Sequence, residues 1–91
     1  MTIYVDQPTV YPNAPTFYGR TTQWCHLWSD SNDAEEVKVF GALIGLQPGW
    51  FQDREGFPHF DLTPSNRKVA LMHGAQEHSL KAWIKERMYP V

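Results

Sequence analysis

Short β-prone segments alternate with helical patterns along this chain, and that alternation limits the folds open to it. The strand-like segments lie at 2–5, 22–29 and 57–62, with a further edge strand expected at 75–78. The helical patterns lie at 32–44, 64–73 and 79–88. Strands alternating with helices favour a parallel sheet with right-handed crossover connections. The sequence therefore predicts an α/β fold, with a small, mainly parallel sheet of three to four strands flanked by three helices.

Capping residues punctuate the first two helices. Asn32 with Glu35 three residues later imitates a capping box, and Ser31 is an alternative cap. Gly45 is a suitable left-handed stop. Thr63 followed by Pro64 is a strong helix start, because proline lacks the N–H that would have no intrahelical partner there. Helical spacing assigns these apolar side chains to the core: Val37, Phe40, Leu43, Ile44, Val69, Met72, Leu80, Trp83 and Ile84.

Composition narrows the class of protein. The 91 residues suffice for one domain, and a net charge of -2 supplies no basic surface for duplex nucleic acid. The lone cysteine, Cys25, has no internal disulfide partner, and the N-terminus lacks the pattern of a signal peptide. No run approaches the roughly 20 apolar residues that span a bilayer. These features predict a cytoplasmic protein.

Residues 7–20 are rich in proline and aromatic residues and predict a loop. Loops of this length in a compact domain are usually functional or poorly ordered. The aromatic side chains Tyr11, Phe17 and Tyr18 are expected to pack down as a cover over the sheet edge.

Three strand-like segments each end in an aspartate: Asp6, Asp30 and Asp61. In a parallel sheet the ends of these strands meet at the edge where open α/β folds bind ligands. Three carboxylates at one edge repel one another unless a cation intervenes, which suits Mg²⁺ or Mn²⁺. His26 and His59 lie on the same segments and are candidate catalytic bases. The structural alternative is that the aspartates cap turns and both histidines are core residues.

The start of the second helix is a candidate anion site. Its first turns combine free backbone donors with hydroxyl and cationic side chains, which suit phosphate. The candidate ligand-binding residues are Thr63, Ser65, Arg67 and Lys68. Alternatively, the two cations point to solvent or pair with nearby carboxylates.

Cys25 beside His26 suggests a nucleophile with its base. Adjacent strand residues point to opposite faces, so the two cannot hydrogen-bond as a catalytic pair without a bulge. We therefore set this pairing aside.

Blocks of sequence over nearly the whole chain resemble a known family. The blocks are Ile3-Tyr4-Val5-Asp6, Trp24-Cys25-His26-Leu27 with Ser29-Asp30, Phe40 with Ile44-Gly45-Leu46, Pro58-His59-Phe60-Asp61-Leu62-Thr63-Pro64-Ser65-Asn66-Arg67 and Gly74-Ala75. They resemble a family of short bacterial and bacteriophage proteins, the domain-of-unknown-function family number four thousand and thirty-one. The resemblance implies the size, a bacterial or phage origin and emphasis on the same histidines and aspartates, but no activity. The chain departs from the pattern at Asn66, where relatives usually carry a basic residue.

Three functions are compatible with these features. The first is a metal-dependent enzyme acting on a phosphoester or nucleotide, with Asp6, Asp30 and Asp61 on the ion and His26 or His59 as general base. The second is a non-catalytic module that binds a phosphorylated small molecule. The third is a protein that binds a host protein or its own copy, as a homodimer, through exposed tryptophans.

Overall fold

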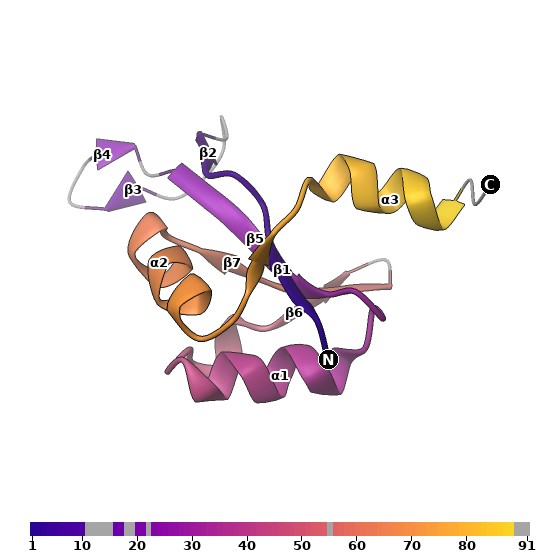
Figure 1. Cartoon of the computed structure of the whole chain (residues 1–91). Helices are drawn as coiled ribbons and strands as arrows, with labels where there is room; N and C mark the ends of the chain where they lie inside the picture. Colours follow the sequence, from indigo (N-terminus) through magenta and orange to yellow (C-terminus); the bar gives the residue numbers. More distant parts are fainter. Residues whose placement is uncertain (11–15, 18–19, 22, 55, 89–91) are drawn as a thin grey trace.

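A sheet with helices on both faces forms the molecule (Figure 1). The computed structural model describes residues 1–10, 16–17, 20–21, 23–54 and 56–88. The strands of the sheet are β1 (Ile3–Val5), β2 (Thr9–Val10), β5 (Gln23–Ser29), β6 (Gln52–Arg54), β7 (Phe57–Leu62) and β8 (Gln76–Glu77). The helices are α1 (Ala34–Leu43), α2 (Pro64–Met72) and α3 (Leu80–Met88), with a 3-10 turn at Pro48–Trp50. The short strands β3 (Thr16–Phe17) and β4 (Arg20–Thr21) pair with each other.

The sheet is mostly antiparallel, so the predicted mainly parallel sheet of three to four strands is wrong. Its order is β6-β7-β5-β1-β8, and β2 also pairs with β5. β5 is antiparallel to β1, β2 and β7, and β6 is antiparallel to β7. β1 with β8 is the parallel pair among the described strands. The chain remains an α/β fold, with three helices and a six-stranded mixed sheet.

A strand that was not predicted from the sequence explains the difference in direction. The segment after α1 contains β6, which forms a hairpin with β7. Gly56 lies between these strands with a φ of 73°, a conformation that glycine adopts without steric cost. The hairpin reverses the chain, so that β7 returns beside β5 in the opposite direction. The helix crossovers still join strands of one direction: β5 to β6 through α1, and β7 to β8 through α2.

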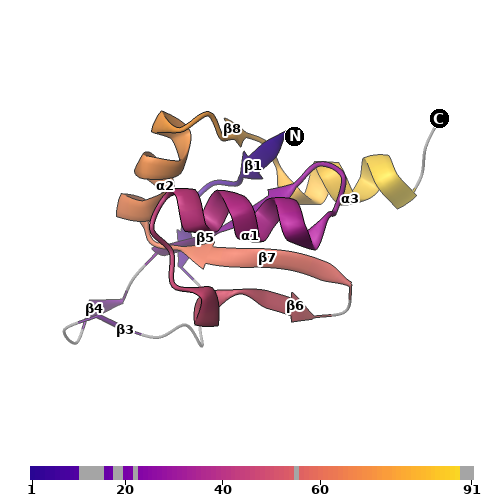
Figure 2. The ribbon, with the colours of Figure 1, turned by 90° about the horizontal axis from the view of Figure 1, so that it is seen from below.

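Alternation along the strands gives the sheet two different faces. One face carries the core, in which α1 and α2 cover the apolar side chains of β1, β5 and β7. Figure 2 shows α1 running beside β5 and β7, with β6 on the other side of β7. The strand residues in this core are Ile3, Val5, Cys25, Leu27, Phe60 and Leu62. The intervening residues point to the opposite face, which we call the polar face because it carries the histidines and aspartates.

Helix α3 covers one end of the polar face. Trp83 is its buried anchor, with its ring centroid 5.8 Å from that of Trp28 and 6.0 Å from that of Phe57. The rest of α3 extends away from the sheet (Figure 1). Among the described residues, none of the helices has the length and apolar character needed to cross a bilayer.

The start of α1 differs by one residue from the predicted cap. Asp33 caps the helix, because its side chain accepts hydrogen bonds from the N–H groups of Glu35 and Glu36. Asn32 has a φ of 58°, and this left-handed conformation is incompatible with the extended backbone of an N-cap. The predicted stop at Gly45 is confirmed.

The second and third helices begin as predicted. The Thr63 hydroxyl accepts from the Asn66 N–H, Pro64 is the first residue of α2, and the Ser79 hydroxyl accepts from the Ala82 N–H. The stop at Gly74 and the edge strand within 75–78 are also confirmed.

The predicted core is right at its centre and wrong at two helix ends. Phe40 and Trp83 are both 4 % exposed, as expected. Leu43 and Met72 are instead 64 % and 76 % exposed, and their chain neighbours Ile44 and Leu71 pack against the core in their place. Ile84 is also exposed, since α3 reaches the sheet mainly through Trp83.

Gly41 is a close-approach position, and replacing it with alanine is expected to destabilise the fold. A Cβ atom there would collide with the ring of Phe60. Overpacking typically costs 1–3 kcal/mol, about 1 kcal/mol of which the better helix propensity of alanine offsets. We therefore expect a lower free energy of unfolding for Gly41→Ala in urea titrations.

The matched control is Gly49→Ala, because no atom lies within 4 Å of a Cβ built at Gly49. Equal stabilities of the two variants would show that the ring of Phe60 moves aside at little cost.

Candidate functional site

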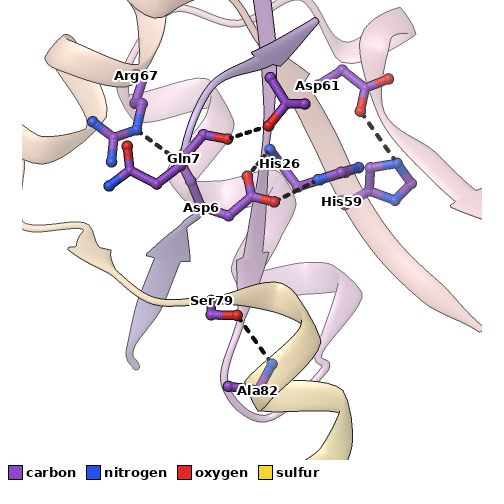
Figure 3. A network of polar contacts seen from close by, with 9 residues as sticks. Asp6, Gln7, His26, His59, Asp61, Arg67, Ser79 and Ala82 are labelled. Atoms are coloured by element: carbon purple, nitrogen blue, oxygen red, sulfur yellow. Dashed lines mark hydrogen bonds and ion pairs between the residues drawn. The ribbon is translucent and has the colours of Figure 1, made fainter. Parts of the chain in front are cut away.

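Two histidine–aspartate pairs from three segments meet on the polar face of the sheet (Figure 3). We call Asp6, His26, His59 and Asp61 the His–Asp site. His26 and Asp61 are direct partners in the β5–β7 register, so their side chains point to the same side. His59 is two residues before Asp61 on β7 and shares that side. The rings of the two histidines meet edge to face, with centroids 5.6 Å apart.

Asp6 holds His26 at two points. One carboxylate oxygen, Oδ1, accepts the backbone N–H of His26 at 2.6 Å. The other, Oδ2, lies 2.9 Å from Nδ1 of the imidazole ring. Both side chains are mostly shielded, with exposures of 14 % for Asp6 and 22 % for His26. This geometry fixes the orientation of the imidazole ring relative to the sheet.

His59 is held more deeply. Its Nδ1 lies 2.8 Å from the carbonyl oxygen of Phe57, and its Nε2 lies 3.5 Å from Oδ1 of Asp61. The ring of Phe57 stacks on the ring of His59, with centroids 4.6 Å apart. The second carboxylate oxygen of Asp61 accepts a hydrogen bond from the amide of Gln52 at 2.6 Å. Asp61 is therefore oriented between a neighbouring strand and the imidazole of His59.

The partners of the two Nδ1 atoms determine which nitrogen of each histidine exchanges a proton. A carboxylate and a backbone carbonyl can only accept hydrogen bonds. Nδ1 must therefore carry hydrogen and donate in both His26 and His59. In the neutral ring, Nε2 is then the nitrogen that takes up a proton.

The surroundings of His26 favour its protonated form. Burial by itself lowers the pKa of this imidazole, because it penalises the charge. The hydrogen bond and negative charge of Asp6, together with the charge of Asp61, outweigh burial and raise the pKa above its usual value. His26 therefore carries its proton to higher pH than a free histidine.

The three aspartates expected to hold a metal ion do not come together. The amide of Asp30 donates to the carbonyl of Thr2, whereas the amide of Asp6 donates to the carbonyl of His26. These contacts lie four residues apart along the β1–β5 ladder, and four extended residues span about 13 Å. Asp30 therefore lies just past the last residue of β5, whereas Asp6 and Asp61 lie beside His26 at the middle of that strand.

Asp30 instead anchors α3. Its carboxylate accepts from the indole N–H of Trp83 at 3.3 Å, and its carbonyl accepts from Arg87 at 2.8 Å. Within the part of the chain that is described, no three His, Cys, Asp or Glu side chains are arranged to hold a metal ion. The residues present thus do not fit the expected three-carboxylate Mg²⁺ or Mn²⁺ site.

The predicted anion-binding residues divide into two groups. Ser65 and Lys68 are exposed to solvent at the start of α2. Thr63 uses its hydroxyl as the helix cap. Arg67 turns inward, where its guanidinium donates to the carbonyl of Asp6 at 2.8 Å and to the carboxylate of Glu77 at 2.6 Å.

Cys25 is a core residue. It lies on the helix-covered face, opposite to His26, and is 1 % exposed. Burial is the main reason that the pKa of its thiol rises to about 12, so it does not form a thiolate near neutral pH. As the alternation along the strand predicts, Cys25 and His26 do not form a catalytic pair.

Three further residues contribute to the site and were not predicted from the sequence: Gln52, Phe57 and Glu77. Gln52 and Glu77 lie on short polar strands, which have no apolar alternation to reveal them. Phe57 had a usable signal, since it precedes His59 by two residues and shares its face. The aromatic side chains expected to cover the site, Tyr11, Phe17 and Tyr18, lie outside the described side chains.

Replacing Asp6 with asparagine is expected to weaken the pH dependence of stability. The raised pKa means that protonated His26 stabilises the fold, fully so below its unfolded-state pKa of about 6.5. This contribution is lost as pH rises through the higher folded-state pKa. Asp6→Asn removes the charge that favours imidazolium, so the difference in unfolding free energy between wild type and variant should shrink across that window. Urea unfolding at a series of pH values measures it.

Asp53→Asn is the control, because Asp53 is an exposed carboxylate on β6. Parallel pH profiles for wild type and Asp6→Asn would contradict a stabilising His26–Asp6 pair.

Comparison with known proteins places the chain in a family. No curated protein and no solved structure matched it. One family model, described as "Protein of unknown function (DUF4031)", matched residues 3–88. Since this match covers nearly the whole chain, the protein belongs to the DUF4031 family.

Proposed function

We propose that the His–Asp site performs general acid–base catalysis on a phosphoester or nucleotide, with His26 and His59 as the proton-transfer groups. The observation that carries the proposal is that both imidazoles are anchored through Nδ1, one by the Asp6 carboxylate and one by the Phe57 carbonyl. In each ring Nε2 is then the nitrogen that exchanges a proton, and in His59 it faces the carboxylate of Asp61 at 3.5 Å.

Cleavage of a phosphoester needs one group that takes a proton from the nucleophile and one that gives a proton to the leaving oxygen. Two imidazoles with centroids 5.6 Å apart can contact one small substrate at the same time. His26, whose pKa is raised by Asp6, suits the role of acid. His59 then suits the role of base, and Asp61 stabilises its imidazolium after proton uptake.

We assign the binding site for the phosphate group of the substrate to the start of α2. This helix begins with its Thr63 cap two residues after Asp61, so the positive end of its dipole follows the site directly along the chain. Ser65 and Lys68 are exposed in its first turns and are the proposed phosphate ligands. Arg67 is left out of this role, because both of its contacts are made within the protein.

Turnover of small phosphoesters tests the proposal. The full-length protein would be assayed with bis(p-nitrophenyl) phosphate, p-nitrophenyl phosphate and 2′,3′-cyclic mononucleotides, with EDTA and with added Mn²⁺ or Mg²⁺. We expect EDTA-resistant turnover that falls by 10²- to 10⁴-fold in His26→Gln or His59→Gln, the usual contribution of a general acid or base. His73→Gln is the matched control, because His73 is exposed at the end of α2.

Each other outcome selects against the proposal in a defined way. Turnover that EDTA abolishes would show that the protein is a metal-dependent enzyme, which contradicts metal-free acid–base catalysis. Binding of a mononucleotide, seen as amide shifts around His26 and His59 but without turnover, would make the chain a non-catalytic binding module. If neither turnover nor amide shifts are seen at tens of millimolar ligand, the remaining function is binding of another protein or of a second copy of this chain.

A further inference from the structure

Arg67 joins three elements around the His–Asp site. It lies in the early part of α2, and its side chain is 14 % exposed. Its Nε–H donates to the carbonyl of Asp6 at 2.8 Å, and one Nη donates to the Glu77 carboxylate at 2.6 Å. Glu77 belongs to β8, and Asp6 follows β1. Figure 3 shows the guanidinium on the backbone of Asp6, on the side away from His59.

The contact falls where the ladder between β1 and β8 ends. Val5 is paired with Glu77, and the carbonyl of Val5 accepts from the N–H of His78. Among the described residues the ladder between β1 and β8 ends at this point, and Arg67 donates to the next carbonyl along the chain, that of Asp6. Asp6 is thus held by Arg67 on one side and by the N–H and Nδ1 of His26 on the other.

Glu77 keeps the guanidinium in place. One of its carboxylate oxygens pairs with Arg67, and the other accepts from the side-chain amide of Gln7 at 2.5 Å. Gln7 is the next residue after Asp6. The contacts therefore close a loop around Asp6, from its own carbonyl through Arg67 and Glu77 to its chain neighbour.

We propose that Arg67 is a positioning residue, which fixes the Asp6 carboxylate on His26 by holding the Asp6 carbonyl, with Glu77 orienting its guanidinium. This role rests on the proposed acid–base function, because it matters for activity only if His26 transfers a proton. It differs from the role of a phosphate ligand, which the sequence alone suggested for Arg67.

Loss of Arg67 would change the pKa of His26 in two opposite directions, one through the lost charge of Arg67 and one through the position of the Asp6 carboxylate. The ionisable groups around His26 are Asp6 after β1, His59 and Asp61 on β7, Arg67 on α2 and Glu77 on β8, with Cys25 on the other face. Loss of the positive charge of Arg67 would leave the surroundings more negative and raise the pKa of His26. Loss of a fixed Asp6 carboxylate would weaken its hydrogen bond and lower that pKa.

Arg67→Lys separates the two effects, because lysine keeps the charge but lacks the planar fork that reaches two partners. We expect the pKa of His26, measured by NMR titration of its imidazole without substrate, to shift downward in Arg67→Lys. Lys68→Gln, at the exposed neighbouring position, should leave it unchanged. An unchanged or higher His26 pKa in folded Arg67→Lys would overturn the proposal.

A measurement on the wild-type protein covers the case in which Arg67→Lys does not fold. The Nε–H of Arg67 should exchange more slowly with water than that of exposed Arg54, and inorganic phosphate at tens of millimolar should not shift it. Equally fast exchange, or a phosphate-induced shift, would overturn the positioning role. Since no substrate is present, both results are independent of whether the site turns over a phosphoester.

Discussion

The alternation of side chains along β5 is the constraint on which the rest of the structure depends. β5 is the central strand and pairs with β1, β2 and β7. Cys25 and Leu27 point into the core beneath α1 and α2, whereas His26 and Trp28 point to the polar face. A shift of register by one residue would exchange the two faces and bury the histidine against the helices. One strand thus fixes the core and the position of the site together.

The local signals in the sequence predicted more of the fold than its periodicity did. Thr63, Pro64, Gly45 and Gly74 act through backbone geometry within a few residues, so the helix ends that they mark agree with the structure. The direction of a strand depends on its partners, and the apolar pattern of β7 is the same whether it runs parallel or antiparallel to β5. The decisive element was β6, whose polar sequence of three residues carries no strand pattern.

The sequence predicted that Asp6 and Asp61 lie at one place in the sheet, but through a strand arrangement that differs from the one observed. Asp6 and Asp61 were expected at one edge of a parallel sheet, yet they lie on one face of an antiparallel sheet, where His26 lies opposite Asp61. The same antiparallel arrangement separates Asp30 from Asp6, since Asp30 follows the end of β5 beside the start of β1, whereas Asp6 follows the end of β1. The contact between His59 and Asp61 needs only the two-residue repeat of a single strand, which the sequence shows directly.

Trp83, the residue that attaches helix α3 to the sheet, also packs on the aromatic side chains beside the site. Trp83 packs on Phe57, which in turn stacks on His59. The position of the His59 ring therefore depends on a helix that contributes no ionisable group to the site. A substitution in α3 that displaces Trp83 should therefore shift the ring of His59, because the ring of Phe57 lies between them and contacts both. It should not alter the contacts of Asp6 or His26 directly.

The charge balance of the site determines how an anionic ligand can bind. Arg67 is neutralised by Glu77, and protonated His26 is neutralised by Asp6. Asp61 then carries the remaining charge, which is negative and repels a phosphate. Under the proposed function, the positive charge of Lys68 and the positive end of the α2 dipole have to offset this repulsion, whereas a neutral ligand has no such requirement.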